Sequence, residues 1–170
     1  MDMFDLIPVL LSAGAVVMDV KSARISNRWI LMGLAGAFLG QLLRSGGQGI
    51  LAGMKGFCIP FLLLGWLFPF RMMGAGDIKL LCVLGVFLGP ERILFCLMWT
   101  MGIGAVFSLI RLCTKKMMRQ RVLYFFRYLR NFLITKEIVP YRTGGWERPE
   151  NMPFTIPILL GILLGFCRAY

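Results

Sequence analysis

The stretch GAGDIKLLCVLGVFL, residues 74–88, places two glycines and an aspartate directly before an apolar segment. Gly74 and Gly76 lack a Cβ, so the chain can form a strained turn here and another backbone can approach it closely. Asp77 opens the apolar segment, where the positive end of a helix dipole favours a negative charge. The whole chain has only eight Asp and Glu in 170 residues. Asp77 is therefore the first candidate for a functional residue.

The composition around this stretch is that of a membrane protein. The chain is 58% hydrophobic and 16% charged, with a mean hydropathy of +0.76, whereas globular chains are about 45–50% apolar and about 25% charged. The apolar segments cover residues 4–18, 29–43, 50–70, 78–88, 93–110 and 152–167. We expect an all-α bundle of about six transmembrane helices that forms one domain over residues 1–170.

The basic residues predict how this bundle is oriented. Lys and Arg are frequent in the connections 19–28 and 111–151 and sparse in the connection 44–49. Basic loops stay in the cytoplasm, so the N-terminus is expected outside the cell. Asp19 and Asp77 then lie at the same, cytoplasmic face of the membrane.

The connection 111–151 also contains a helical pattern. Its apolar positions Val122, Leu123, Phe125, Phe126, Leu129, Phe132 and Leu133 recur at helical spacing. We expect an amphipathic helix within about residues 113–150, lying in the cytoplasmic headgroup layer with its bases on anionic lipid. An alternative is that this helix forms a docking surface for a substrate. The net charge of +11 is explained by lipid contact and orientation, so no nucleic-acid partner is expected.

Metal and thiol chemistry are not expected. The chain has no histidine, and its five cysteines are scattered without a Cys-x-x-Cys pair. Zinc sites and histidine-activated nucleophiles thus lose their usual ligand or base. We expect neither a metal nor a cofactor.

A second aspartate, Asp19, closes the first apolar segment. Two neighbouring carboxylates that share one proton can hydrolyse a peptide, because the ionised group activates water and the protonated group polarises the carbonyl. Each aspartate alone has an ordinary explanation, as a helix cap or as an interfacial residue. As a pair on one face of the membrane, they indicate an intramembrane-type aspartic peptidase.

Three motifs extend this interpretation to a known family. The chain resembles the type IV prepilin peptidases and their archaeal preflagellin relatives, the GxGD aspartic peptidases. The matching motifs are DVKSARISN (19–27), GAGDIK (74–79) and MPFTIP (152–157). Ser26 stands where the family usually has proline.

The resemblance implies that Asp19 and Asp77 are the catalytic pair and that Gly74, Gly76 and Lys79 support them. Lys79 also has a simpler explanation, as a lysine whose amine extends to the membrane interface. The cysteine-bearing domain of the bifunctional relatives is not found, so methylation and S-adenosylmethionine are not expected. The short form resembles the stand-alone peptidases of Flp-type pilus systems.

By this resemblance, the partner is a prepilin-like precursor whose short basic leader is cut at the cytoplasmic face of a prokaryotic plasma membrane. Glu147 and Glu150 are candidates for contact with the basic leader. There are three alternatives to this interpretation. The first is a presenilin-type enzyme, but this chain contains neither the Tyr-Asp nor the Pro-Ala-Leu motif of those enzymes. The other two, a small transporter and a non-enzymatic assembly factor, belong to other functional classes.

Overall fold

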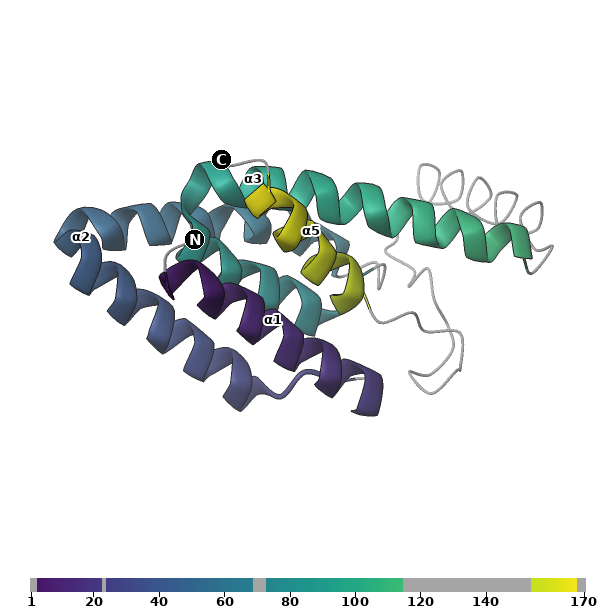
Figure 1. Cartoon of the computed structure of the whole chain (residues 1–170), viewed down its shortest axis with the longest axis horizontal. Helices are drawn as coiled ribbons and strands as arrows, with labels where there is room; N and C mark the ends of the chain where they lie inside the picture. Colours follow the sequence, from purple (N-terminus) through teal and green to yellow (C-terminus); the bar gives the residue numbers. More distant parts are fainter. Residues whose placement is uncertain (1–2, 23, 69–72, 115–153, 168–170) are drawn as a thin grey trace, which may run out of the picture.

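The computed structural model describes residues 3–22, 24–68, 73–114 and 154–167 of the chain. Its elements are α1 (Met3–Ser22), α2 (Asn27–Leu64), a short 3-10 turn η1 (Gly65–Leu67), α3 (Ala75–Thr114) and α5 (Thr155–Cys167). The described part of the chain is helical and contains no strand, as the predicted all-α class requires. Figure 1 shows the helices lying side by side, with α2 and α3 each reversing direction.

The long helices α2 and α3 are each broken at one glycine. Gly46 (φ 56°) interrupts α2 and Gly89 (φ 76°) interrupts α3, both in the left-handed region that glycine adopts without steric cost. The breaks fall between the segments predicted at 29–43 and 50–70 and between those at 78–88 and 93–110. With α1 and α5, the described residues thus form six helical arms. The loops expected at 44–49 and 89–92 were wrong in extent, because single glycines make both turns.

Contacts beside Gly46 show that α2 folds back on itself. A Cβ placed on Gly49 would collide with the backbone oxygen of Gln41. Eight residues along a straight helix would separate these positions by about 12 Å. The two arms of α2 are therefore antiparallel neighbours immediately after the turn.

The break in α3 is supported by a side chain from α2. Pro90 has no N–H, so it cannot donate to the carbonyl of Val86 four residues earlier. The Gln41 amide instead donates to Val86 O at 2.8 Å and to Phe87 O at 3.1 Å. One polar side chain thus satisfies the carbonyls that the proline and the turn leave without helical partners, which matters most where water is excluded.

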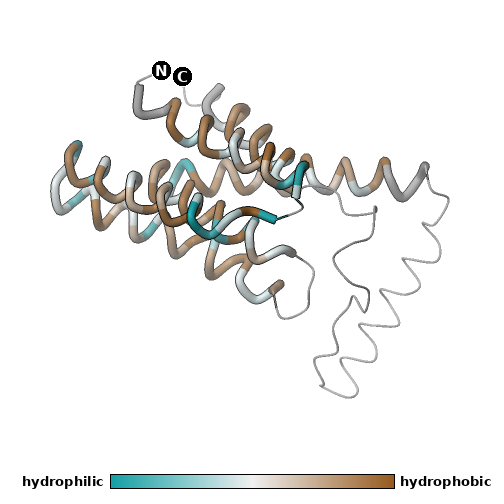
Figure 2. The backbone as a smooth tube through the Cα atoms, turned by 90° about the horizontal axis from the view of Figure 1, so that it is seen from below, coloured by the Kyte–Doolittle hydropathy of each residue, from teal (hydrophilic) through white to brown (hydrophobic). Residues whose placement is uncertain are grey.

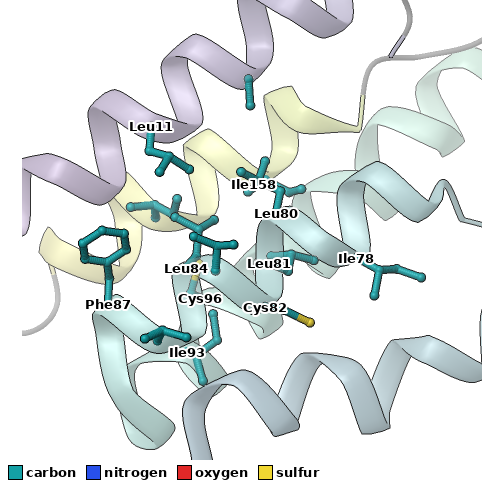
Figure 3. Close-up of a cluster of buried hydrophobic side chains, with 14 of the residues drawn as sticks. Leu11, Ile78, Leu80, Leu81, Cys82, Leu84, Phe87, Ile93, Cys96 and Ile158 are labelled. Atoms are coloured by element: carbon teal, nitrogen blue, oxygen red, sulfur yellow. The ribbon is translucent and has the colours of Figure 1, made fainter. Parts of the chain in front are cut away.

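The first arm of α3 is the centre of the fold. Every residue from 80 to 87 is buried, and Leu80, Leu81 and Leu84 are fully inaccessible. Figure 3 shows side chains of this arm meeting Leu11 of α1 and Ile158 of α5. A helix that is apolar on all sides is normally surrounded by other helices. The segment predicted at 78–88, which is shorter than a usual membrane span, is therefore the innermost one.

The closest helix contact joins α2 to α3 through two glycines. A Cβ on Gly56 would collide with the backbone oxygen of Gly85, and a Cβ on Gly85 with that of Gly56. Small residues let helix backbones approach closely, which is a main source of packing energy between membrane helices. The interface between α2 and α3 is accordingly the most extensive in the structure.

The outer helix α1 is fixed to its neighbours by specific contacts. The Trp29 indole N–H donates to Leu11 O at 3.1 Å, and its ring occupies the space where a side chain at Gly14 would lie. These contacts connect α1 to the beginning of α2. Beyond them, α1 packs mainly on α5.

Two helical stretches, Asn27–Leu67 and Ala75–Ile110, are long and apolar enough to cross a membrane. Figure 2 shows apolar residues along most of the helices, with hydrophilic residues mainly near helix ends and turns. The predicted interfacial helix and the candidate residues Glu147 and Glu150 lie outside the described residues. α3 itself continues to Thr114, so the connection expected to begin at residue 111 begins later.

We predict that Gly56→Ala destabilises the fold by about 1–3 kcal/mol, because the added methyl group would collide with backbone that cannot move aside. The measurement is thermal unfolding of the purified protein in detergent. Gly36→Ala is the matched control, since it lies in the same helix and a Cβ there would meet open space. An unfolding temperature of Gly56→Ala equal to that of Gly36→Ala would contradict the prediction.

Candidate active site

Asp19 lies in the last turns of α1, next to the first residue of α5. Its carboxylate oxygen Oδ2 accepts a hydrogen bond of 2.8 Å from the Thr155 hydroxyl. Thr155 is fully buried, whereas Asp19 is partly exposed. The bond links the end of α1 to the start of α5, so these two helices run antiparallel.

Asp77 lies in the first turn of α3, two residues after the helix begins at Ala75. Its Oδ2 faces back over Gly74, where a Cβ would lie 3.0 Å from that oxygen. This end of the helix carries unpaired N–H groups and the positive end of the dipole, so a carboxylate is favourable there. The arm that carries Asp77 is the buried centre of the bundle.

The two aspartates belong to one site. Asp19 acts electrostatically on Asp77, and both side chains are only partly exposed. The fold thus joins two carboxylates that are 58 positions apart in the sequence. Like charges in such a setting favour a state in which one carboxyl group is protonated and the other is ionised.

The glycines of the 74–79 motif have a different role from the one expected. The left-handed backbone that glycine permits is not used at Gly74 or Gly76, because the positive-φ glycines of the described residues are Gly46 and Gly89. Gly74 instead leaves room for the Asp77 carboxylate. A Cβ on Gly76 would lie 3.4 Å from Ile25, an ordinary contact. Gly76 therefore brings the α1–α2 connection against the start of α3 without being sterically required to be glycine.

Lys79 is connected to the first motif. Its Nζ donates to Asn27 Oδ1 at 3.0 Å, which ties the exposed lysine to the first residue of α2. It is the exposed member of an otherwise buried run from Ile78 to Phe87. The contact supports a structural link beside the aspartates, beyond simple extension of the amine towards an interface.

All three sequence motifs therefore meet at one end of the bundle. The first supplies Asp19 and Asn27, the second Asp77 and Lys79, and the third Thr155. Thr155 and Asn27 were not among the predicted site residues, although they lie inside the 152–157 and 19–27 motifs. The motifs predicted which segments form the site. Which side chain in them contacts a carboxylate depends on how the helices pack.

A metal centre has no support among the residues that the structure describes. No group of three or more His, Cys, Asp or Glu side chains there could hold a metal ion. The thiols of Cys58, Cys82 and Cys96 are free. The described site residues offer two carboxyl groups, a hydroxyl, an amide and an amine.

Comparison with known proteins agrees with this arrangement. The type IV leader peptidase family matches residues 6–109, which is more than half of the chain and includes both aspartates. The chain belongs to the type IV leader peptidase family, and it is a leader-peptidase-like protease. Together with the two long apolar helical stretches, this family indicates a membrane protein. Neither the curated proteins nor the solved structures gave a match.

The different surroundings of the two glycines lead to a prediction about cleavage activity. Gly74→Ala would crowd the Asp77 carboxylate, and a displacement near 1 Å can cost about 100-fold in rate. We expect Gly74→Ala to lower the cleavage rate by about 10- to 100-fold without loss of thermal stability. Gly76→Ala meets only an ordinary contact with Ile25 and should fold equally well. Activity of Gly74→Ala at the wild-type level would contradict this account of Gly74.

Proposed function

We propose that this protein is an aspartic endopeptidase that removes the short basic leader from prepilin-like precursors. The observation that carries the proposal is that Asp19 and Asp77 lie at the same end of the bundle and interact electrostatically, within the region that matches the leader peptidase family. The Gly74–Lys79 motif and the Asp19–Asn27 motif support it, because their residues contact each other in the fold.

The proposed reaction uses the two carboxyl groups in complementary states. The ionised carboxylate takes a proton from water, and the resulting hydroxide adds to the scissile carbonyl carbon. The protonated carboxyl group donates to the carbonyl oxygen and stabilises its developing charge. Collapse of the tetrahedral intermediate breaks the C–N bond, and the leaving amine receives a proton from the carboxyl group that acted as base. The site needs no further cofactor for this sequence.

We further propose that the six helical arms cross a prokaryotic plasma membrane, with the N-terminus outside and both aspartates at the cytoplasmic face. The basic connections 19–28 and 111–151 support this orientation. The apolar helix of the precursor would lie in the bilayer, and its leader would reach the aspartates from the cytoplasm. Anionic lipid at the same face is the second proposed partner, through the basic connections.

Substitution of either aspartate tests the reaction. Asp19→Asn and Asp77→Asn should each lower cleavage by about 10²–10⁴-fold or more, because general acid–base catalysis contributes about that much. The measurement is co-expression with a candidate prepilin in a host that lacks its own prepilin peptidase, followed by a gel that resolves the leader. Glu91→Gln is the matched control, since Glu91 is an exposed carboxylate just past the Gly89 turn, at the start of the second arm of α3.

Each outcome of this experiment has a defined meaning. Cleavage that survives Asp19→Asn or Asp77→Asn removes that aspartate from the mechanism. Absence of cleavage by the wild-type protein across a panel of pilin-like precursors, with pilus assembly still dependent on the protein, would favour a non-enzymatic assembly factor.

The orientation has a separate test in two single-cysteine variants of a cysteine-free protein that still cleaves. Arg24 and Gly47 are both exposed, at connections expected on opposite faces of the membrane. A membrane-impermeant maleimide should label Gly47→Cys in intact cells, and Arg24→Cys only after permeabilisation. Labelling of Arg24→Cys in intact cells would place the aspartates on the outer side instead.

A further inference from the structure

We propose that Thr155 is a positioning residue that orients the Asp19 carboxylate for hydrolysis, an inference that rests on the proposed peptidase function. Thr155 lies outside the region that matches the leader peptidase family, which ends at residue 109. The assignment comes from the geometry of α5 against α1.

The contact between Thr155 and Asp19 is short and sheltered from solvent. The hydroxyl donates to Asp19 Oδ2 at 2.8 Å, and Thr155 itself has no exposed surface. It is the only hydrogen bond recorded for the Asp19 side chain within the described part of the chain. A donor on Oδ2 restricts the rotation of the Asp19 carboxylate.

The start of α5 is itself held firmly. One turn and two turns after Thr155, Ile158 and Ile162 are buried in the core beside α3. Between them, Gly161 contacts Thr100 and Cys96 so closely that any side chain there would collide with Thr100. Pro157 lies in the first turn, where its missing N–H costs no helical hydrogen bond. The Thr155 hydroxyl is therefore attached to a rigid support.

The direction of the hydrogen bond also assigns different catalytic roles to the two aspartates. A group that donates to a carboxylate favours the ionised form of that carboxylate. Asp19, as the acceptor, fits the member that takes the proton from water, and Asp77 fits the member that donates to the carbonyl oxygen. A base that is oriented by a third group is a recurring arrangement in hydrolytic sites.

A purely structural role for Thr155 gives a different expectation. A side-chain hydrogen bond between membrane helices contributes to stability, and its loss would lower the amount of folded protein. It would not change the turnover of the molecules that remain folded. A positioning role lowers kcat and leaves KM unchanged, since the carboxylate acts on the reaction and not on binding of the precursor.

The experiment compares Thr155→Val, Thr155→Ser and Thr100→Val in detergent or liposomes, with the precursor that the wild-type protein cleaves. Thr155→Val preserves the shape of the side chain but removes the donor, whereas Thr155→Ser retains it. Thr100→Val is the matched control, because Thr100 is also fully buried and contacts α5 at Gly161, about 9 Å along that helix from Thr155. Thermal unfolding is measured for all variants.

We expect Thr155→Val to lower kcat by about 10- to 100-fold with KM within about twofold of the wild type, and Thr155→Ser to restore most of the rate. Thr100→Val should keep the wild-type kcat even if its unfolding temperature falls equally. A wild-type kcat in Thr155→Val would overturn the inference. So would a loss of kcat in Thr155→Ser and Thr100→Val as large as the loss in Thr155→Val. Failure of the proposed function is distinct, because then the wild-type protein itself cleaves no precursor.

Discussion

The close crossing of α2 and α3 at Gly56 and Gly85 is the contact on which the rest of the structure depends. With no Cβ on either side, the two backbones approach far enough for the first arm of α3 to sit inside the bundle. All its residues from 80 to 87 are then buried. This central position matters for the site, because Asp77 stands at the open end of that same arm.

The broken helices are the second constraint. Gly46 and Gly89 each reverse the chain within one residue, so neighbouring arms pack directly without long loops. Such a sharp turn leaves backbone carbonyls without helical partners, and an unpaired carbonyl in an apolar environment is costly. The Gln41 amide satisfies two of them beside Pro90. Gln41 thus lies beside these turns, and both aspartates lie near helix ends.

At the candidate active site, three separate helix ends contribute one functional group each. The end of α1 brings Asp19, the start of α3 brings Asp77 and the start of α5 brings Thr155. Each group belongs to a helix whose core-facing side is packed. The positions of the three groups therefore depend on packed helices and not on loops. This arrangement suits two carboxyl groups that must adopt different protonation states beside one substrate, because their separation depends on rigid elements.

The sequence by itself determined the all-α class, the six apolar segments and the identity of Asp19 and Asp77 as candidates, because hydropathy and charge are local properties. It also pointed to the three motifs, and the family match supports the resemblance drawn from them. The tertiary structure decided that single glycines make the turns at 46 and 89, that residues 78–88 form the centre, and that Thr155 reaches Asp19. These features depend on backbone dihedral angles and on contacts across more than a hundred residues, as between Asp19 and Thr155, which no local pattern encodes.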